Sequence, residues 1–145
     1  MSKPRIAVVG IGRLGSFNTT LVLAGDLFDL VALVEPVEAT RHVATEEFSV
    51  RGVADISEIV DEIDCAIIAT PTLYHFEVAQ TLLNAGKHLL IEKPISFEIA
   101  QANKLIAIAE SKQLVLQVGH VERFNPAFRA VANHVATPLF IDAVR

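Results

Sequence analysis

The 145-residue sequence has very few of the residues that form covalent or metal cross-links. Cys65 is its only cysteine, and the chain contains one methionine and no tryptophan. A single cysteine excludes an intramolecular disulfide, and no cysteine pattern has the spacing of a metal site. Because Cys65 stands in an apolar run, we expect a buried, unreactive thiol in a reducing, cytoplasmic compartment. We expect no metal site.

The sequence also lacks an excess of basic residues and a long apolar segment. Its 12 Lys and Arg against 17 Asp and Glu give a net charge of −5, which disfavours general binding to nucleic acid or to anionic membranes. No apolar run approaches the roughly 18 residues that a transmembrane helix needs. The N-terminus lacks the apolar core of a signal peptide. We therefore expect a cytoplasmic protein that binds neither nucleic acid nor membrane.

The most informative segment that is present opens the chain. Arg5–Val9 is a β-branched apolar run that leads directly into a G-x-G-x-x-G pattern at Gly10, Gly12 and Gly15, and a helical pattern follows at Leu14–Ala24. The first glycine permits a tight turn, the second lets backbone amides approach a pyrophosphate, and the third lets the helix pack closely on the strand. The anion is then expected at the helix N-terminus.

An acidic residue follows at the spacing that a dinucleotide-binding fold uses. The apolar run Leu30–Val34 ends at Glu35, which lies 20 residues after Gly15. A carboxylate there accepts hydrogen bonds from both ribose hydroxyls of an adenosine. It would repel a 2′-phosphate, and no basic residue follows until Arg41. The sequence therefore favours NAD over NADP.

Strand-like and helix-like segments alternate along the rest of the chain. The helical pattern at Leu73–Ala85 ends at a C′ glycine, Gly86, and the helical pattern at Phe97–Ser111 has Ser96 as its expected N-cap. Alternation at these lengths predicts βαβ units. The expected fold is of the α/β class, a doubly wound parallel sheet (Rossmann fold). Further strands are expected at Leu30–Val34, Gly52–Ala54, Cys65–Ala69, His88–Ile91 and Leu114–Val118.

Two polar segments lie where expected strands end, which is where ligands bind in open α/β sheets. One is Ala69-Thr70-Pro71 with His75 four residues later, and the other is Glu92-Lys93-Pro94. With the glycine pattern, these segments resemble the N-terminal NAD-binding domain of the glucose-fructose oxidoreductase, inositol dehydrogenase and rhizopine-catabolism (Gfo/Idh/MocA) oxidoreductase family. The resemblance covers about residues 3–145 and rests most on the E-K-P motif.

The resemblance implies roles for individual residues. Lys93 is the implied catalytic residue, whose ammonium would stabilise the developing alkoxide or carbonyl and assist proton transfer. Glu92 would position nearby groups, and Pro94 would follow a cis peptide. We expect a structural or cofactor-positioning role for His75, because it falls in the first turn of a helix. The candidate cofactor-binding residues are Gly10, Gly12, Arg13, Leu14, Gly15, Glu35, Ala69, Thr70, Pro71, His75, Glu92, Lys93 and Pro94.

Substrate contacts are expected after the last strand of the sheet. The segment Gly119–Pro126 is most similar to the V-G-H-x-x-R-F-N-P loop of family members that act on nucleotide-linked sugars. With Lys93, the substrate candidates are His120, Arg123 and Asn125. Arg123 either pairs with a phosphate or carboxylate through its planar fork or forms a hinge contact between domains.

The expected domain division follows from the same family resemblance. Residues 1–119 are expected to form the dinucleotide-binding domain. Residues 120–145 would be a connecting loop, a helix at Ala127–His134 and a strand at Pro138–Val144 that begins a truncated α/β substrate domain. Full family members carry most substrate contacts and an acid–base His in that domain. We therefore expect this chain alone to be inactive. We also expect the full-length protein to be a homo-oligomer.

The sequence thus favours the cofactor domain of an NAD-dependent oxidoreductase acting on a secondary alcohol of a sugar or nucleotide sugar. Two alternatives remain. One is a biliverdin-type reductase, which shares a similar glycine loop and fold. The other is a non-catalytic nucleotide-binding or redox-sensing module.

Overall fold

The structure is a computed structural model that describes residues 2–132, 140 and 142. Parallel strands form one six-stranded sheet in the order β3-β2-β1-β4-β5-β6. The chain starts at the centre of the sheet, builds outward to β3, and then crosses to the other side of β1 to build β4, β5 and β6. The switch point between β1 and β4 is where a doubly wound sheet opens a crevice for ligands. The strands are β1 (Arg5–Val9), β2 (Asp29–Val34), β3 (Gly52–Val53), β4 (Cys65–Ile68), β5 (His88–Ile91) and β6 (Leu116–Val118).

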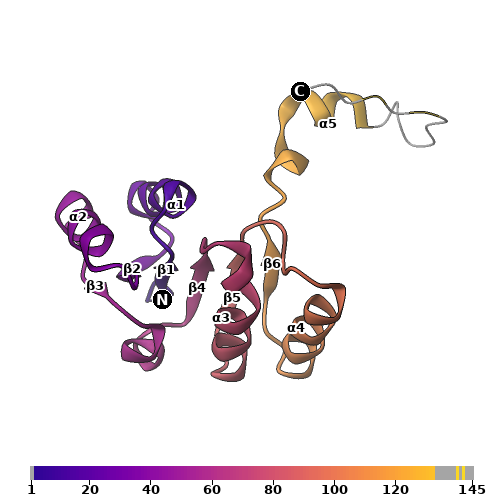
Figure 1. The fold of residues 1–145 in the computed structure, drawn as a ribbon. Coiled ribbons are helices and arrows are strands. Elements are labelled where there is room, and N and C mark those ends of the chain that lie inside the picture. Colours follow the sequence, from indigo (N-terminus) through magenta and orange to yellow (C-terminus); the bar gives the residue numbers. More distant parts are fainter. Residues whose placement is uncertain (1, 133–139, 141, 143–145) are drawn as a thin grey trace.

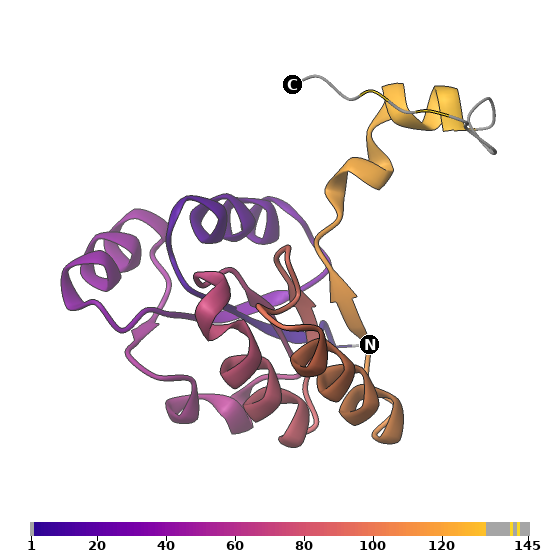
Figure 2. The same cartoon turned by 45° about the vertical axis from the view of Figure 1, so that its right-hand side comes forward.

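Helices cover both faces of the sheet, as the alternating pattern predicts (Figure 1). Helices α1 and α2 lie on one face, and α3 and α4 lie on the other. Figures 1 and 2 both show η3 and α5 extending beyond the end of β6, away from the other helices. The helices are α1 (Arg13–Ala24), α2 (Glu38–Phe48), α3 (Thr72–Asn84), α4 (Ile99–Ser111) and α5 (Pro126–Ala132), with 3₁₀ turns η1 (Ile56–Glu58), η2 (Val60–Glu62) and η3 (Val121–Phe124).

The hydrophobic core has two halves because successive residues of a strand point to opposite faces. On β1, Ala7 and Val9 pack on the side of α3 and α4, while Ile6 and Val8 pack on the side of α1 and α2. All four side chains are buried. Strands buried on both faces read as continuous apolar runs, which is why they can be recognised in the sequence.

Several expected boundaries are corrected by the structure. Ser96 is not the N-cap of the fourth helix: Glu98 takes that position in a capping box with Gln101, and the Ser96 hydroxyl donates to the Glu98 carbonyl. The last strand starts at Leu116, two residues later than expected. Gly86 follows α3 with a φ of 77°, as a C′ glycine does.

Cys65 differs from expectation in its burial. It is only partly buried, although burial still raises the pKa of its thiol to about 11. A thiol with a raised pKa stays protonated and is a poor nucleophile at neutral pH, so an unreactive thiol stays the prediction for Cys65. The strand expected at Pro138–Val144 lies outside the described residues apart from Phe140 and Asp142. Among the described residues, no helix is long and apolar enough to cross a membrane.

An ion pair fastens the start of β1 to the segment before β4. The Arg5 guanidinium donates to both oxygens of Asp64, with Nε to Oδ2 at 3.1 Å and Nη2 to Oδ1 at 2.8 Å. The Arg5 backbone N–H also donates to Oδ2, at 2.8 Å. These bonds hold the pKa of the Asp64 carboxyl well below its usual range. The pair therefore favours the β1–β4 register, at the opposite end of the strands from the cleft described below.

We expect Asp64→Asn to lower the free energy of unfolding at pH 7 and to have a smaller effect at pH 3. Because the folded-state pKa is depressed, the carboxylate stabilises the folded chain above the unfolded-state value of about 3.9 and loses this contribution as the pH falls further. Urea unfolding followed by circular dichroism at both pH values measures the difference. An equal effect of the substitution at pH 7 and pH 3 would contradict this assignment.

Candidate functional site

A cleft of about 770 Å³ lies at the carboxyl ends of the central strands. The loops that follow β1, β2, β3 and β4 form its walls, together with the first turns of α3. The cleft therefore occupies the switch point of the sheet, where the fold rule places a ligand. The expected cofactor-binding residues that line it are Gly10, Gly12, Arg13, Leu14, Glu35, Ala69, Thr70 and Pro71.

The glycine loop has the shape that its sequence predicts. Gly10 has a φ of +85°, and a Cβ there would come within 2.7 Å of the Thr70 backbone. A Cβ on Gly15 would overlap the Gly10 carbonyl oxygen, so the helix packs directly on the turn. At Gly12, by contrast, a Cβ would meet nothing within 4 Å. Gly10 and Gly15 therefore serve the fold, and Gly12 leaves open space facing the cleft.

The N-terminus of α1 opens into this space. Gly12 is its N-cap and provides no side-chain hydrogen bond, and the Ser16 N–H donates to the Gly12 carbonyl at 2.9 Å. The first N–H groups of an α-helix have no partner within the helix, and the helix dipole adds positive potential there. Arg13, the first residue of α1, is exposed. This terminus is suited to an anionic group such as a pyrophosphate.

Glu35 is held in place by backbone donors on both sides. Its Oε2 accepts the Ile11 N–H at 3.0 Å, and its Oε1 accepts the Val37 N–H at 3.0 Å. Only 9% of the residue is exposed. Each oxygen of a carboxylate can accept about two hydrogen bonds, so each retains capacity for a ribose hydroxyl. The carboxylate is thus oriented before any ligand binds.

Arg41, six residues further along the chain, contacts the main chain of Glu35. Its Nη1 donates to the backbone carbonyls of Glu35 at 2.7 Å and Pro36 at 3.1 Å. A cation is therefore present beside Glu35, although the guanidinium is engaged with main-chain oxygens. The expected preference for NAD over NADP stays a prediction, and it depends on the Glu35 carboxylate rather than on the absence of basic residues.

Thr70 supplies an independent indication that the cleft accepts a polar ligand. Among the buried side-chain nitrogen and oxygen atoms of the described residues, its Oγ1 is the one that lacks a hydrogen-bond partner. An unpaired buried hydroxyl is costly, and a bound ligand or water normally satisfies it. With the open space at Gly12 and the oriented Glu35 carboxylate, it makes the cleft a good fit for a dinucleotide such as NAD.

His75 links two loops instead of lining the cleft. It is 1% exposed, with Nδ1 2.8 Å from the Pro94 carbonyl oxygen and Nε2 2.8 Å from the Thr70 carbonyl oxygen. A neutral imidazole has one N–H and donates to one of these carbonyls at a time. His75 therefore joins the loop after β4 to the loop after β5. Its expected influence on the cofactor stays a prediction.

The residues of the E-K-P motif have different surroundings. The Lys93–Pro94 peptide is cis, as the resemblance implies. Glu92 is partly buried and accepts from Asn18 Nδ2 at 3.3 Å, while its carboxylate lies against Gly119. Lys93 is exposed at the end of β5 and does not line the cleft. The catalytic role of Lys93 stays a prediction.

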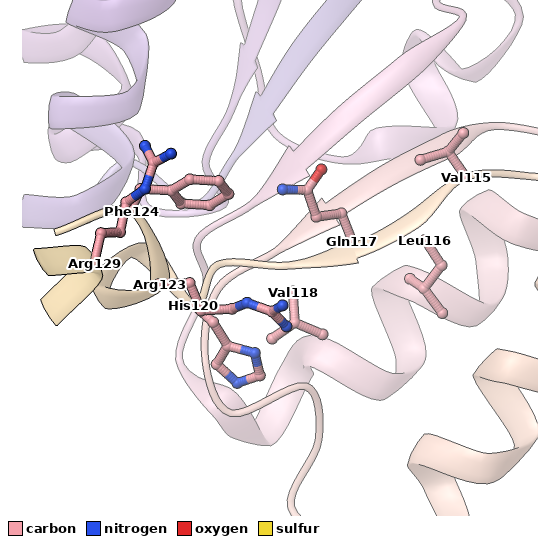
Figure 3. Close-up of a pocket in the computed structure, with 8 residues that line it drawn as sticks. All are labelled: Val115, Leu116, Gln117, Val118, His120, Arg123, Phe124 and Arg129. Atoms are coloured by element: carbon pink, nitrogen blue, oxygen red, sulfur yellow. The ribbon is translucent and has the colours of Figure 1, made fainter. Parts of the chain in front are cut away.

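A second cavity, of about 710 Å³, lies along β6, η3 and α5 (Figure 3). It contains His120 and Arg123 of the expected substrate residues. In Figure 3 these two side chains point to one side of the chain, whereas Phe124 and Arg129 point to the other. Asn125 is instead engaged locally, with Oδ1 accepting the Ala127 N–H and Nδ2 donating to Glu122. Of the expected substrate residues, His120 and Arg123 therefore share this cavity, whereas Asn125 and Lys93 do not line it.

Part of the cleft was not predicted as a site from the sequence. The residues concerned come from the ends of β1 and β2, from the segments that follow β2 and β3, and from α3: Val9, Val34, Pro36, Val37, Thr40, Ala54, Asp55, Ile56, Tyr74 and Val78. Asp55 had a usable signal, because it directly follows an expected strand and strand ends meet at the same sheet edge. Tyr74 and Val78 had none beyond helical spacing. Among the described residues, no group of three or more His, Cys, Asp or Glu is placed to hold a metal ion.

Comparison with known proteins connects this cleft to a family. A family profile described as "Oxidoreductase family, NAD-binding Rossmann fold" matches residues 4–120. The chain is 34% identical to the UDP-N-acetylglucosamine 3-dehydrogenase of Acidithiobacillus ferrooxidans over 97% of this chain and 45% of that protein. The chain therefore spans less than half the length of this relative.

Solved structures give the same result. The structure of that Acidithiobacillus ferrooxidans enzyme superposes with a TM-score of 0.84 at 31% identity, covering 92% of this chain and 44% of its own. The scyllo-inositol dehydrogenase of Lactobacillus casei, solved with bound NAD(H) and scyllo-inositol, also superposes with a TM-score of 0.84. The identity is 29%, and the match covers 93% of this chain and 41% of that enzyme's chain. The expected Rossmann fold is thereby confirmed.

The contrast between two glycines gives a matched test of the loop. We expect Gly12→Val to change the free energy of unfolding by less than about 1 kcal/mol and to weaken NAD binding by at least about tenfold, because its side chain enters the cleft. Gly15→Ala should destabilise the fold by about 1–3 kcal/mol, because its Cβ overlaps the Gly10 carbonyl. Urea unfolding and calorimetric NAD titration measure both quantities. Unchanged NAD binding by the Gly12→Val chain would show that the ligand sits elsewhere.

Proposed function

The chain belongs to the oxidoreductase family with an NAD-binding Rossmann fold, and we propose that it is the cofactor half of a sugar or nucleotide-sugar dehydrogenase. Such an enzyme moves a hydride between nicotinamide and a secondary alcohol. One observation carries the proposal: the open α1 N-terminus and the oriented Glu35 carboxylate line the same cleft. The substrate class is supported by the relatives, which are named as dehydrogenases of UDP-N-acetylglucosamine and scyllo-inositol.

Each group of the cleft has a distinct task in holding the cofactor. The N–H groups at the start of α1 and the exposed Arg13 would hold the pyrophosphate. Glu35 would accept hydrogen bonds from the ribose hydroxyls, and Thr70 Oγ1 would donate to a cofactor oxygen. When bound, the nicotinamide ring supplies hydride exchange at its C4 position. The protein contributes orientation and charge rather than redox chemistry of its own.

Lys93 would act on the substrate oxygen. It follows β5, which pairs with β4 on the side of the sheet away from Glu35. Lys93 therefore lies on the side of the cleft where the nicotinamide half of a dinucleotide would be held if its adenosine lay at β2. An exposed ammonium there would stabilise negative charge on the substrate oxygen. His120 and Arg123, after β6, would contact more distant substrate groups such as the phosphates of a nucleotide sugar.

We expect the chain to bind NAD at least about tenfold more tightly than NADP, because a 2′-phosphate would face the Glu35 carboxylate. Glu35→Ala should narrow this preference, since Arg41 remains beside the site. Calorimetric titration with both cofactors measures the ratio. Glu47→Ala, which removes an exposed acid at the far end of α2, should leave the ratio unchanged. Equal affinities in the unmodified chain would refute the role of Glu35.

In the full-length protein, Lys93→Ala should lower kcat by about 10²–10⁴-fold if the lysine assists proton transfer. NADH formation across a panel of sugars, cyclitols and nucleotide sugars measures the rate. Lys112→Ala removes an exposed lysine at the C-cap of α4 and serves as the control. A Lys93→Ala enzyme with the unmodified rate would remove Lys93 from the mechanism.

A further inference from the structure

The cleft presents its binding groups in the order of the strands. The start of α1 follows β1, Glu35 follows β2, and Asp55 follows β3, and these three strands are neighbours in the sheet. With the pyrophosphate at α1 and the ribose at Glu35, the next group of a dinucleotide in the same direction is its base. The base therefore reaches the end of β3, where Asp55 and Ile56 line the cleft.

The walls at this end of the cleft suit a flat aromatic ring. Val37, Ile56 and Val78 present apolar surface, and Tyr74 adds an aromatic ring that is 51% exposed. These side chains come from segments on three different sides of the cleft: the loop after β2, the loop after β3, and α3. A purine placed between them buries its faces and leaves its edge toward polar groups.

Asp55 is the charged side chain at that edge, and its orientation is fixed. Its Oδ1 accepts from the Ser57 N–H at 2.8 Å and from the Ser57 hydroxyl at 2.6 Å. Glu58 completes a capping box by accepting the Asp55 N–H at 2.9 Å. These bonds occupy Oδ1 alone, and within the described part of the chain Oδ2 makes no hydrogen bond. The Ser57 bonds use Oδ1, so Oδ2 is the oxygen left to accept from a ligand in the cleft that Asp55 lines.

The charge state of Asp55 determines what it can recognise. Hydrogen bonds from Ser57 lower the pKa of the Asp55 carboxyl. At neutral pH the group is therefore ionised and can only accept hydrogen bonds. It favours a partner with an N–H donor and disfavours a carbonyl oxygen.

We propose that Asp55 determines which purine base the cleft accepts, by receiving a hydrogen bond from the exocyclic amino group of adenine on Oδ2. A purine that carries a carbonyl oxygen at that position places two acceptors face to face. The inference rests on the proposed binding of NAD and adds a selection for its base. It assigns to Asp55 a role that is separate from the selection of the ribose by Glu35.

The test compares NAD with nicotinamide hypoxanthine dinucleotide, in which a carbonyl oxygen replaces the adenine amino group. A hydrogen bond to a charged group corresponds to about a 10–100-fold difference in affinity. We expect the unmodified chain to favour NAD by that factor in calorimetric titrations. Asp55→Asn should abolish or reverse this preference, because the amide oxygen stays with the Ser57 donors and the Nδ2 group at the base donates to a carbonyl oxygen but accepts nothing from an amino group.

Two controls separate base recognition from capping. Asn is as good an N-cap as Asp, so the Asp55→Asn chain should keep its thermal unfolding midpoint. Ser57→Ala removes the hydroxyl bond to Oδ1 and should keep the preference for NAD. Asp61→Asn, an acid-to-amide change in η2 outside the cleft, should also keep it.

The outcomes distinguish this inference from the proposed function. If the unmodified chain binds both dinucleotides equally, NAD binding stands and the role of Asp55 is overturned. The same conclusion follows if Asp55→Asn retains the preference of the unmodified chain. If neither dinucleotide binds, both the proposed function and this inference fail.

Discussion

The hydrogen bond from the Ile11 N–H to the Glu35 carboxylate joins the loop after β1 to the loop after β2, and the cleft depends on it. The bond is 3.0 Å long and buried. The second Glu35 oxygen fixes the start of the next segment through the Val37 N–H. A buried N–H without a partner costs about 1–3 kcal/mol, so the acid serves the fold as well as the ligand. The side chain that we propose to select the ribose is thus one that the fold already holds in place.

The sheet was largely predictable from the sequence because its strands are buried on both faces. Val8 and Val9 point to opposite sides of β1 and both are buried, so the run carries no polar interruption. Elements that bury little gave a weaker signal. Helix α2 buries only Ala44, and the sequence analysis assigned it no boundaries. The N-cap of α4 was misplaced because Ser96 has the more favourable residue type, whereas the capping box forms at Glu98 and Gln101.

The candidate site was predictable where its residues are local to a strand end. Glu35 could be placed by counting from Gly15, because both positions are set by the strands that precede them. The hydrogen-bond partners of His75 could not be predicted in this way. Pro94 lies 19 residues away, and its carbonyl comes close to the imidazole only because β4 pairs with β5. Asp55 and Tyr74 join the same cleft from separate segments. Composition and spacing do not show which of these segments lie close together in space, because their proximity follows from the order of the strands in the sheet.

We propose that NAD binds in the cleft beside β1, β2 and β3 rather than in the cavity along β6. Nuclear magnetic resonance of the isotopically labelled chain, titrated with NAD, distinguishes the two sites because it reports on each backbone amide. We expect the largest shifts at Arg13, Leu14, Ile56 and Thr70, with small shifts at Gln117, Arg123 and Phe124. The reverse pattern, with shifts concentrated around Arg123 and Phe124, would contradict it.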